Sequence, residues 1–225
     1  MSTIQDSTAR AEILARIRRA TTDVTDKNPE TDTPINWTYG TGIDMEDVVG
    51  TFVEKVIDYS ATVVRVKKAD VPKAVVDGLK ATGADKSAVV PPGLDPSWIK
   101  AIKAAGIEVR IDDPQLSHTE LDNTDAVVTA ASSAVADTGT IVLTHVADQG
   151  RRAISLVPDR HICVVRASQV VSDVGEAMQA VKPAVHEGHP LTWISGGSAT
   201  SDIELSRVDG VHGPRQLYVV VVDDQ

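Results

Sequence analysis

The chain has 225 residues, of which 42% are hydrophobic and only 3% aromatic, and its formal net charge is −10. This length suits one α/β domain, or one domain with a short appendage. Lys and Arg form no run beyond pairs such as Lys67-Lys68 and Arg151-Arg152, so the composition disfavours nucleic acid as a partner. No apolar run approaches the roughly 20 residues of a membrane span, and the N-terminus lacks the apolar stretch of a signal peptide. We therefore expect a cytoplasmic protein without a membrane span.

The single cysteine, Cys163, limits the redox chemistry of the chain. It excludes a disulfide within the chain, and it excludes an iron–sulfur cluster held by the usual set of about four thiolates. Cys163 lies in the apolar run His161-Ile162-Cys163-Val164-Val165, so we interpret it as a small buried hydrophobic residue.

The N-terminal part predicts a helix followed by an irregular segment. In residues 7–20, Ile13, Leu14 and Ile17 share one helical face. Residues 21–43 are rich in Thr, Asp, Asn and Pro. We therefore expect three parts, namely an N-terminal helix over 1–20, a linker over 21–43 and an α/β domain over 44–225.

The first half of that domain alternates between helical and strand-like patterns. A helix is predicted from Asp44 onward, because apolar residues repeat at helical spacing up to Ile57. Strand, helix, strand, helix and strand are then expected at 61–66, 71–81, 87–90, 96–105 and 107–111. This order indicates βαβ units and a mainly parallel sheet flanked by helices.

The second half is less regular, and it contains several short strands. The expected strands are 126–130, 141–143, 161–166, 191–194 and 217–222, with a helix over 174–181. Strands that follow one another between residues 126 and 166 suggest an antiparallel segment added to the parallel sheet.

Three polar, glycine-containing segments are candidates for a ligand site. The first is Ala136-Asp137-Thr138-Gly139-Thr140, in which Gly139 permits a sharp turn beside two hydroxyls and a carboxylate. The alternative is a turn that only joins two strands, and spacing alone favours that alternative.

The second segment runs from Ser195 to Glu204. Gly196, Ser198 and Thr200 give it the composition of an anion-binding loop that leads into a helical turn, although the Gly-Lys-Ser/Thr of a Walker motif is missing. The alternative is a helix start at which Asp202 and Glu204 are favourably placed acids. The two readings have similar support.

The third segment is Gly210-Val211-His212-Gly213-Pro214-Arg215. His212 between glycines, with Arg215 nearby, suits an anionic ligand or a proton transfer, but spacing alone favours a simple turn. His186 and His189 form an incomplete metal site, so we expect no metal in this chain.

Several short motifs in order give the chain a resemblance to a known family. They are Thr138 to Leu143, then Ser155-Leu156-Val157-Pro158, His161-Ile162, the Ser195 to Glu204 loop and the Gly210 to Pro214 turn. From about residue 44 onward the chain resembles the LUD domain family of lactate-utilization proteins, in particular its protein C group. Gly197 stands where that pattern has proline, which loosens the loop.

The resemblance implies a NagB/RpiA/CoA-transferase-like α/β fold. It also implies work beside two partners, a cysteine-rich iron–sulfur subunit and a larger iron–sulfur subunit with its own LUD domain, which together oxidise L-lactate to pyruvate. The single cysteine agrees with this division of labour, so iron–sulfur clusters are expected on the partners and no cofactor on this chain.

Two hypotheses follow. In the first, the chain is a non-redox subunit that binds lactate, pyruvate or a cofactor. In the second, it is a stand-alone enzyme like the CoA transferases, sugar-phosphate isomerases or 5-formyltetrahydrofolate cyclo-ligases, with His212, Glu204 or Asp137 as catalytic candidates. A purely structural role is a weaker third option. The first two share an expected pocket at one end of the sheet, with ligand contacts from Thr138, Gly139, Thr140, Gly196, Ser198, Thr200, Asp202, His212 and Gly213.

Overall fold

The computed structural model describes residues 3–25, 28, 31, 41–200, 208–210 and 212–223. The chain divides into two compact units, Met1–Tyr39 and Gly40–Gln225. The first unit contains helix α1, Thr3–Ala20, in which Ile13 and Ile17 are exposed. No helix in the described part of the chain is long and apolar enough to cross a membrane.

The second unit is built on a six-stranded sheet in which every neighbouring pair is parallel. The mainly parallel sheet expected from the alternating pattern is therefore confirmed. Its strands, in spatial order, are β1 (Thr62–Lys67), β12 (Gln216–Asp223), β7 (Arg160–Arg166), β4 (Ala126–Ala130), β2 (Ser87–Val90) and β3 (Glu108–Ile111).

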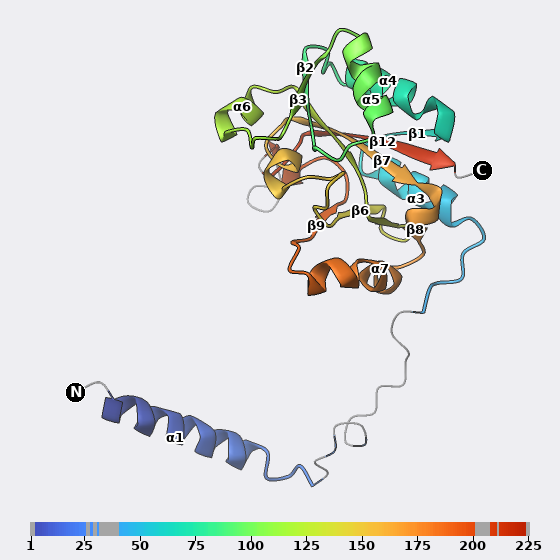
Figure 1. The fold of residues 1–225 in the computed structure, drawn as a ribbon. Helices are drawn as coiled ribbons and strands as arrows, with labels where there is room; N and C mark the ends of the chain where they lie inside the picture. Colours follow the sequence, from blue (N-terminus) through green and yellow to red (C-terminus); the bar gives the residue numbers. More distant parts are fainter. Residues whose placement is uncertain are drawn as a thin grey trace. The chain divides into compact units, whose positions relative to one another are not determined.

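Helices cover both faces of this sheet (Figure 1). One face packs against α4 (Val71–Ala81) and α5 (Pro96–Ala104), and the other carries α3 (Val48–Asp58). The remaining helical elements are α6 (His118–Asp122), α7 (Val174–His186) and the 3-10 turns Lys68–Asp70, Arg152–Ser155 and Ala167–Gln169.

Close packing explains two of the glycines. Gly78 lies in the middle of α4, and a Cβ there would stand 2.7 Å from the ring of Tyr218, so this glycine lets the helix approach β12. Gly139 has φ +58°, and its Cβ would stand 2.7 Å from the carbonyl carbon of Lys55 in α3. Both positions therefore favour glycine for packing, and at Gly139 the positive φ favours glycine for backbone conformation as well.

A second sheet lies outside the main one, and it contains the added antiparallel segment that the sequence predicted. Its order is β8 (Val170–Val171), β5 (Ser133–Val135), β6 (Thr140–Leu143) and β9 (Thr192–Ile194). The antiparallel pairs are β5–β6 and β6–β9, and they belong to this separate sheet. The short β5 is buried on both faces, so no alternation in the sequence marked it as a strand.

Two helix boundaries also differ from expectation. α3 begins at Val48, because the carboxylate of Asp47 accepts a hydrogen bond from the Gly50 amide at 2.8 Å and so caps the helix. α7 continues to His186 although Pro183 lies inside it. His186 therefore ends a helix and does not lie in a loop.

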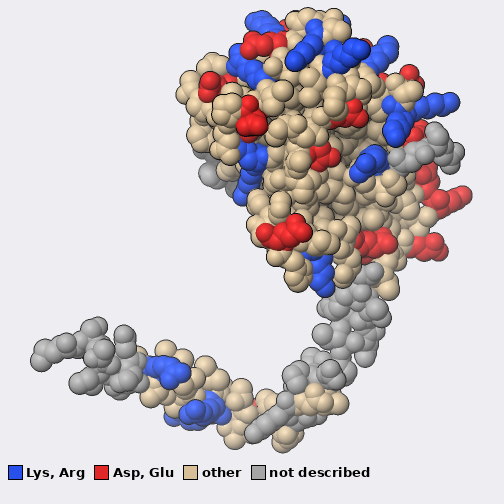
Figure 2. Space-filling model, in the orientation of Figure 1, with Lys and Arg blue, Asp and Glu red and all other residues tan. Residues whose placement is uncertain are grey.

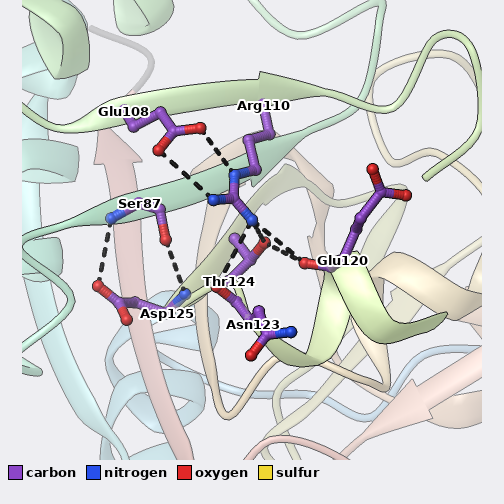
Figure 3. A network of polar contacts seen from close by, with 7 residues as sticks. All are labelled: Ser87, Glu108, Arg110, Glu120, Asn123, Thr124 and Asp125. Atoms are coloured by element: carbon purple, nitrogen blue, oxygen red, sulfur yellow. Dashed lines mark hydrogen bonds and ion pairs between the residues drawn. The ribbon is translucent and has the colours of Figure 1, made fainter. Parts of the chain in front are cut away.

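Arg110 on the edge strand β3 links that edge to α6 (Figure 3). Its guanidinium donates to Glu108 Oε1 at 2.9 Å, to Thr124 Oγ1 at 3.1 Å and to the carbonyl of Glu120 at 3.3 Å. The last bond gives a second donor to a carbonyl at the end of a short helix, which also accepts from Thr124 Oγ1 at 2.7 Å. Next to this network, Asp125 accepts from the Ser87 amide at 3.2 Å.

We predict that Arg110→Leu lowers the free energy of unfolding by about 1–2 kcal/mol, because the Thr124 hydroxyl loses the donor Arg110 and the Glu120 carbonyl loses one of its two donors. Urea denaturation measures this change. The matched control is Arg65→Leu on the opposite edge strand, where the described partner of the guanidinium is Asp223, in an exposed ion pair. That control should lose less than about 1 kcal/mol. Equal losses in the two variants would show that the α6 contacts of Arg110 contribute nothing.

Candidate functional site

Two of the three candidate segments come together around a hollow of about 260 Å³. It lies where β7 and β12 begin and where β9 ends, and we call it the amino-edge hollow. Its lining consists of Ser155, Leu156, His161, the run Thr192 to Ala199, His212, Pro214 and Leu217. The Ser195 loop and the Gly210 to Pro214 turn therefore meet at the same end of the main sheet.

Backbone hydrogen bonds join the loop to the turn. The Ser198 amide donates to the carbonyl of Pro214 at 2.7 Å, and the Gly210 amide donates to the carbonyl of Ser198 at 2.8 Å. The His212 amide donates to Ser198 Oγ at 3.1 Å, so this hydroxyl accepts one bond within the protein and keeps its own proton for a ligand. A Cβ at Gly197 would collide with the carbonyl of Arg215, so the loop in this conformation has no room for a side chain there.

The first segment supports the hollow and does not line it. Thr140 Oγ1 lies 2.8 Å from Ser195 Oγ, and Thr138 Oγ1 lies 2.7 Å from Thr140 Oγ1. This chain of hydroxyls orients Ser195 from behind. Asp137 is exposed, and its amide donates to the carbonyl of Ser172 at 3.1 Å. The structure therefore places Thr138, Gly139 and Thr140 in a supporting layer and Asp137 away from the hollow.

The remaining candidates divide into three groups. His212 is exposed at the rim, and Gly213 lies beside it, where an added Cβ would stand 3.7 Å from Leu156. The backbone of Thr200 ends β10 (Ala199–Thr200), which pairs with β11 (Val208–Asp209). The side chain of Thr200 and the whole of Asp202 and Glu204 lie outside the described residues.

His161 is a lining residue that its sequence spacing did not single out. It is buried near the start of β7, and its Nε2 lies 2.8 Å from Thr129 Oγ1. Burial lowers the pKa of His161 to about 4, so the imidazole is neutral at neutral pH. The one signal in the sequence was an imidazole within an otherwise apolar strand.

A second histidine positions Thr192 in the lining. His145 Nδ1 lies 2.9 Å from the carbonyl of Gly150, which can only accept, so Nδ1 carries the ring proton. Nε2 then accepts from the hydroxyl of Thr192 at 2.7 Å. Burial lowers the pKa of His145, which favours the neutral ring that this arrangement requires.

The composition of the lining limits what the hollow can bind. Among its described lining residues the titratable side chains are His161 and His212, and hydroxyls come from Ser155, Thr192, Ser195 and Ser198. Leu156, Trp193, Ile194 and Leu217 supply apolar surface. Within the described ranges, no three His, Cys, Asp or Glu side chains are grouped to hold a metal ion. The arrangement suits a small molecule with several oxygen atoms.

The chain is similar in sequence to proteins of a known family. The sequence model of the LUD domain matches residues 49–222. The chain belongs to the LUD domain family. It is 45% identical to lactate utilization protein C of Deinococcus radiodurans over 99% of this chain and 100% of that protein. A protein of the same name from Shouchella clausii is 32% identical over 50% of each chain.

A solved structure supports the fold of this LUD domain. The crystal structure of a DUF162 family protein from Deinococcus radiodurans superposes with a TM-score of 0.68 at 44% identity. The superposition covers 80% of this chain and 99% of the DUF162 family protein. The family predicted from the ordered motifs is therefore confirmed.

The depressed pKa of His161 predicts a pH-dependent stability. An unfolded histidine takes up a proton below about pH 6.5, whereas buried His161 does so only near pH 4. The contribution of neutral His161 to the free energy of unfolding is thus complete above pH 6.5, and it is lost as the pH falls from 6.5 to 4. Between about pH 7.5 and 5, wild type should lose roughly 2 kcal/mol more than His161→Gln in urea denaturation. His118→Gln, at an exposed position, is the matched control and should follow wild type. Parallel pH profiles for wild type and His161→Gln would contradict the assignment.

Proposed function

We propose that this chain is the non-redox, ligand-binding subunit of an L-lactate utilization system, and that it binds a small hydroxy or keto acid in the amino-edge hollow. The observation that carries the proposal is the lining itself, in which a buried neutral His161 faces several hydroxyls in about 260 Å³. The names of the relatives in Deinococcus radiodurans and Shouchella clausii point to lactate as the relevant acid.

The chemistry of a 2-hydroxy acid matches these groups. The neutral imidazole of His161 can accept a hydrogen bond from the substrate hydroxyl or donate one to the keto oxygen of the product. The hydroxyls of Ser195 and Ser198 and the ring of His212 can donate to the carboxylate. A small apolar wall, from Leu156 and Leu217, suits a methyl group.

The chain's own cysteine supports a division of labour with redox partners. Oxidation of lactate to pyruvate releases two electrons and two protons, which an acceptor must take up. Cys163 is the only cysteine, it is fully buried in β7, and burial raises the pKa of its thiol to about 12. A single protonated thiol is unsuited to cluster ligation, so we assign electron transfer to iron–sulfur partner subunits.

The alternative of a stand-alone enzyme has less support. Of its three catalytic candidates, Asp137 is exposed and does not line the hollow. Glu204 lies outside the described residues. His212 lines the hollow, but no described carboxylate lies beside it there to act as a nucleophile or second acid–base group.

We predict that His212→Ala weakens binding of L-lactate or pyruvate by about tenfold, the effect of one lost hydrogen bond to a charged group. Isothermal titration calorimetry measures the dissociation constant. Because the His212 side chain is exposed and its backbone bond to Ser198 is retained, the melting temperature should stay close to that of wild type. His118→Ala, also exposed, is the matched control and should bind as wild type does. A loss of stability with unchanged affinity would indicate a structural role.

Growth tests the proposal in the cell. A strain that lacks this chain should not grow on L-lactate, wild type should restore growth, and the His212→Ala form should restore it poorly. The purified chain should also associate with the iron–sulfur partners. Normal growth of the deletion strain on lactate, or no association with the partners, would refute the proposed role.

A further inference from the structure

A larger crevice lies at the opposite edge of the main sheet from the amino-edge hollow. Its volume is about 480 Å³, and it lies where β4, β7 and β12 end, at Ala130, Arg166 and Val222. We call it the carboxyl-edge crevice. In open α/β sheets, the carboxyl ends of the strands are the usual place for ligands. None of the three polar segments found in the sequence lines this crevice.

The crevice combines an apolar floor with a charged rim. Val164, Val222 and Leu94 form part of the floor, and the half-buried indole of Trp98 adds a flat aromatic surface. Its volume lies within the range of pockets that hold cofactor-sized ligands, about 300–1,000 Å³. The start of α5 is not an open anion site, because the Asp95 carboxylate already accepts from the Ser97 amide at 2.8 Å.

Asp148 carries a buried oxygen without a partner. Among the described residues, its Oδ1 is the single buried side-chain nitrogen or oxygen atom that lacks a hydrogen-bond partner. The loop that carries it is held over the crevice, since the Ala130 amide donates to the Asp148 carbonyl at 3.1 Å and the Gly93 amide donates to the Ala147 carbonyl at 2.9 Å. A withdrawn and unpaired carboxylate oxygen costs stability, so its presence calls for an explanation.

The crevice continues into a neighbouring hollow of about 390 Å³, and Asp148, Arg166 and Gln169 line both. The two cations on the rim are Lys68 and Arg166, and both are exposed. Neither forms an ion pair with any residue that the structure describes. Figure 2 shows further Lys and Arg side chains gathered over α4 and α5, whose first turns border the crevice, despite the negative net charge of the chain.

We propose that the carboxyl-edge crevice binds a nucleotide. Its ring lies on Trp98 and the apolar floor, its phosphate pairs with Lys68 and Arg166, and a sugar hydroxyl or ring amino group donates to the Asp148 carboxylate. These contacts use the aromatic surface of Trp98, the two cations that form no ion pair with a described residue and the carboxylate of Asp148, which lines the crevice. The inference does not depend on lactate binding in the amino-edge hollow.

AMP is the probe, and titration calorimetry on the full chain is the measurement. AMP should bind more tightly than either adenosine, which lacks the phosphate, or ribose 5-phosphate, which lacks the ring. Arg166→Gln and Trp98→Leu should each weaken AMP binding by about tenfold. Lys80→Gln, which removes an exposed lysine of α4 outside the lining, is the matched control and should bind as wild type does. Absence of AMP binding, or ribose 5-phosphate binding as tight as AMP binding, would overturn the proposal.

Asp148→Asn separates a ligand contact from a structural role. If Asp148 serves a ligand, this variant should bind AMP about tenfold more weakly and unfold at the same or a higher urea concentration, because an unpaired charge is removed. Reduced stability with unchanged AMP binding would overturn the role given to Asp148. The His212→Ala variant should bind AMP as tightly as wild type does. Failure of the nucleotide proposal and failure of the lactate proposal are therefore distinguishable.

Discussion

β12 pairs along its length with β1 on one side and β7 on the other, and six of its eight residues are buried. Val220 and Val222 face α4 and α5, while Val219 and Val221 face α3 and the second sheet. Burial on both faces holds this last strand in the centre of the sheet. The turn before β12 is thereby held beside the start of β7, which forms the amino-edge hollow, and the end of β12 borders the carboxyl-edge crevice.

Polar side chains within this otherwise apolar core supply hydrogen-bonding groups at the amino-edge hollow. On one face of the central strands, His161, Thr129 and Cys163 are adjacent, with His161 Nε2 2.8 Å and Cys163 Sγ 3.8 Å from the Thr129 hydroxyl. Burial lowers the pKa of the imidazole and raises that of the thiol, so both groups are uncharged. A neutral hydrogen-bonding floor under a rim of hydroxyls is suited to binding a small acid.

The sequence predicted the parallel sheet because buried strands and helices of ordinary length alternate strongly from residue 61 to 111. It did not predict the separate second sheet, since strands as short and as buried as β5 carry no periodicity. It pointed to Ser198 and His212 through glycine-rich turns. His161 stood within the family motif His161-Ile162, but its spacing did not mark it as a lining residue. Nothing in the sequence marks Asp148, whose Oδ1 has no hydrogen-bond partner among the described residues. Thr140 was expected to touch a ligand; it does not line the hollow, and its hydroxyl lies 2.8 Å from Ser195 Oγ.

Whether the amino-edge hollow receives the acid can be measured by a titration of isotope-labelled chain with L-lactate, in which the amide chemical shifts are followed. We expect shift changes concentrated in residues 192–199 and 212–217 and at His161, with residues of the carboxyl-edge crevice unchanged. Changes confined to the carboxyl-edge crevice, or none at lactate concentrations well above those that support growth, would contradict binding in the amino-edge hollow.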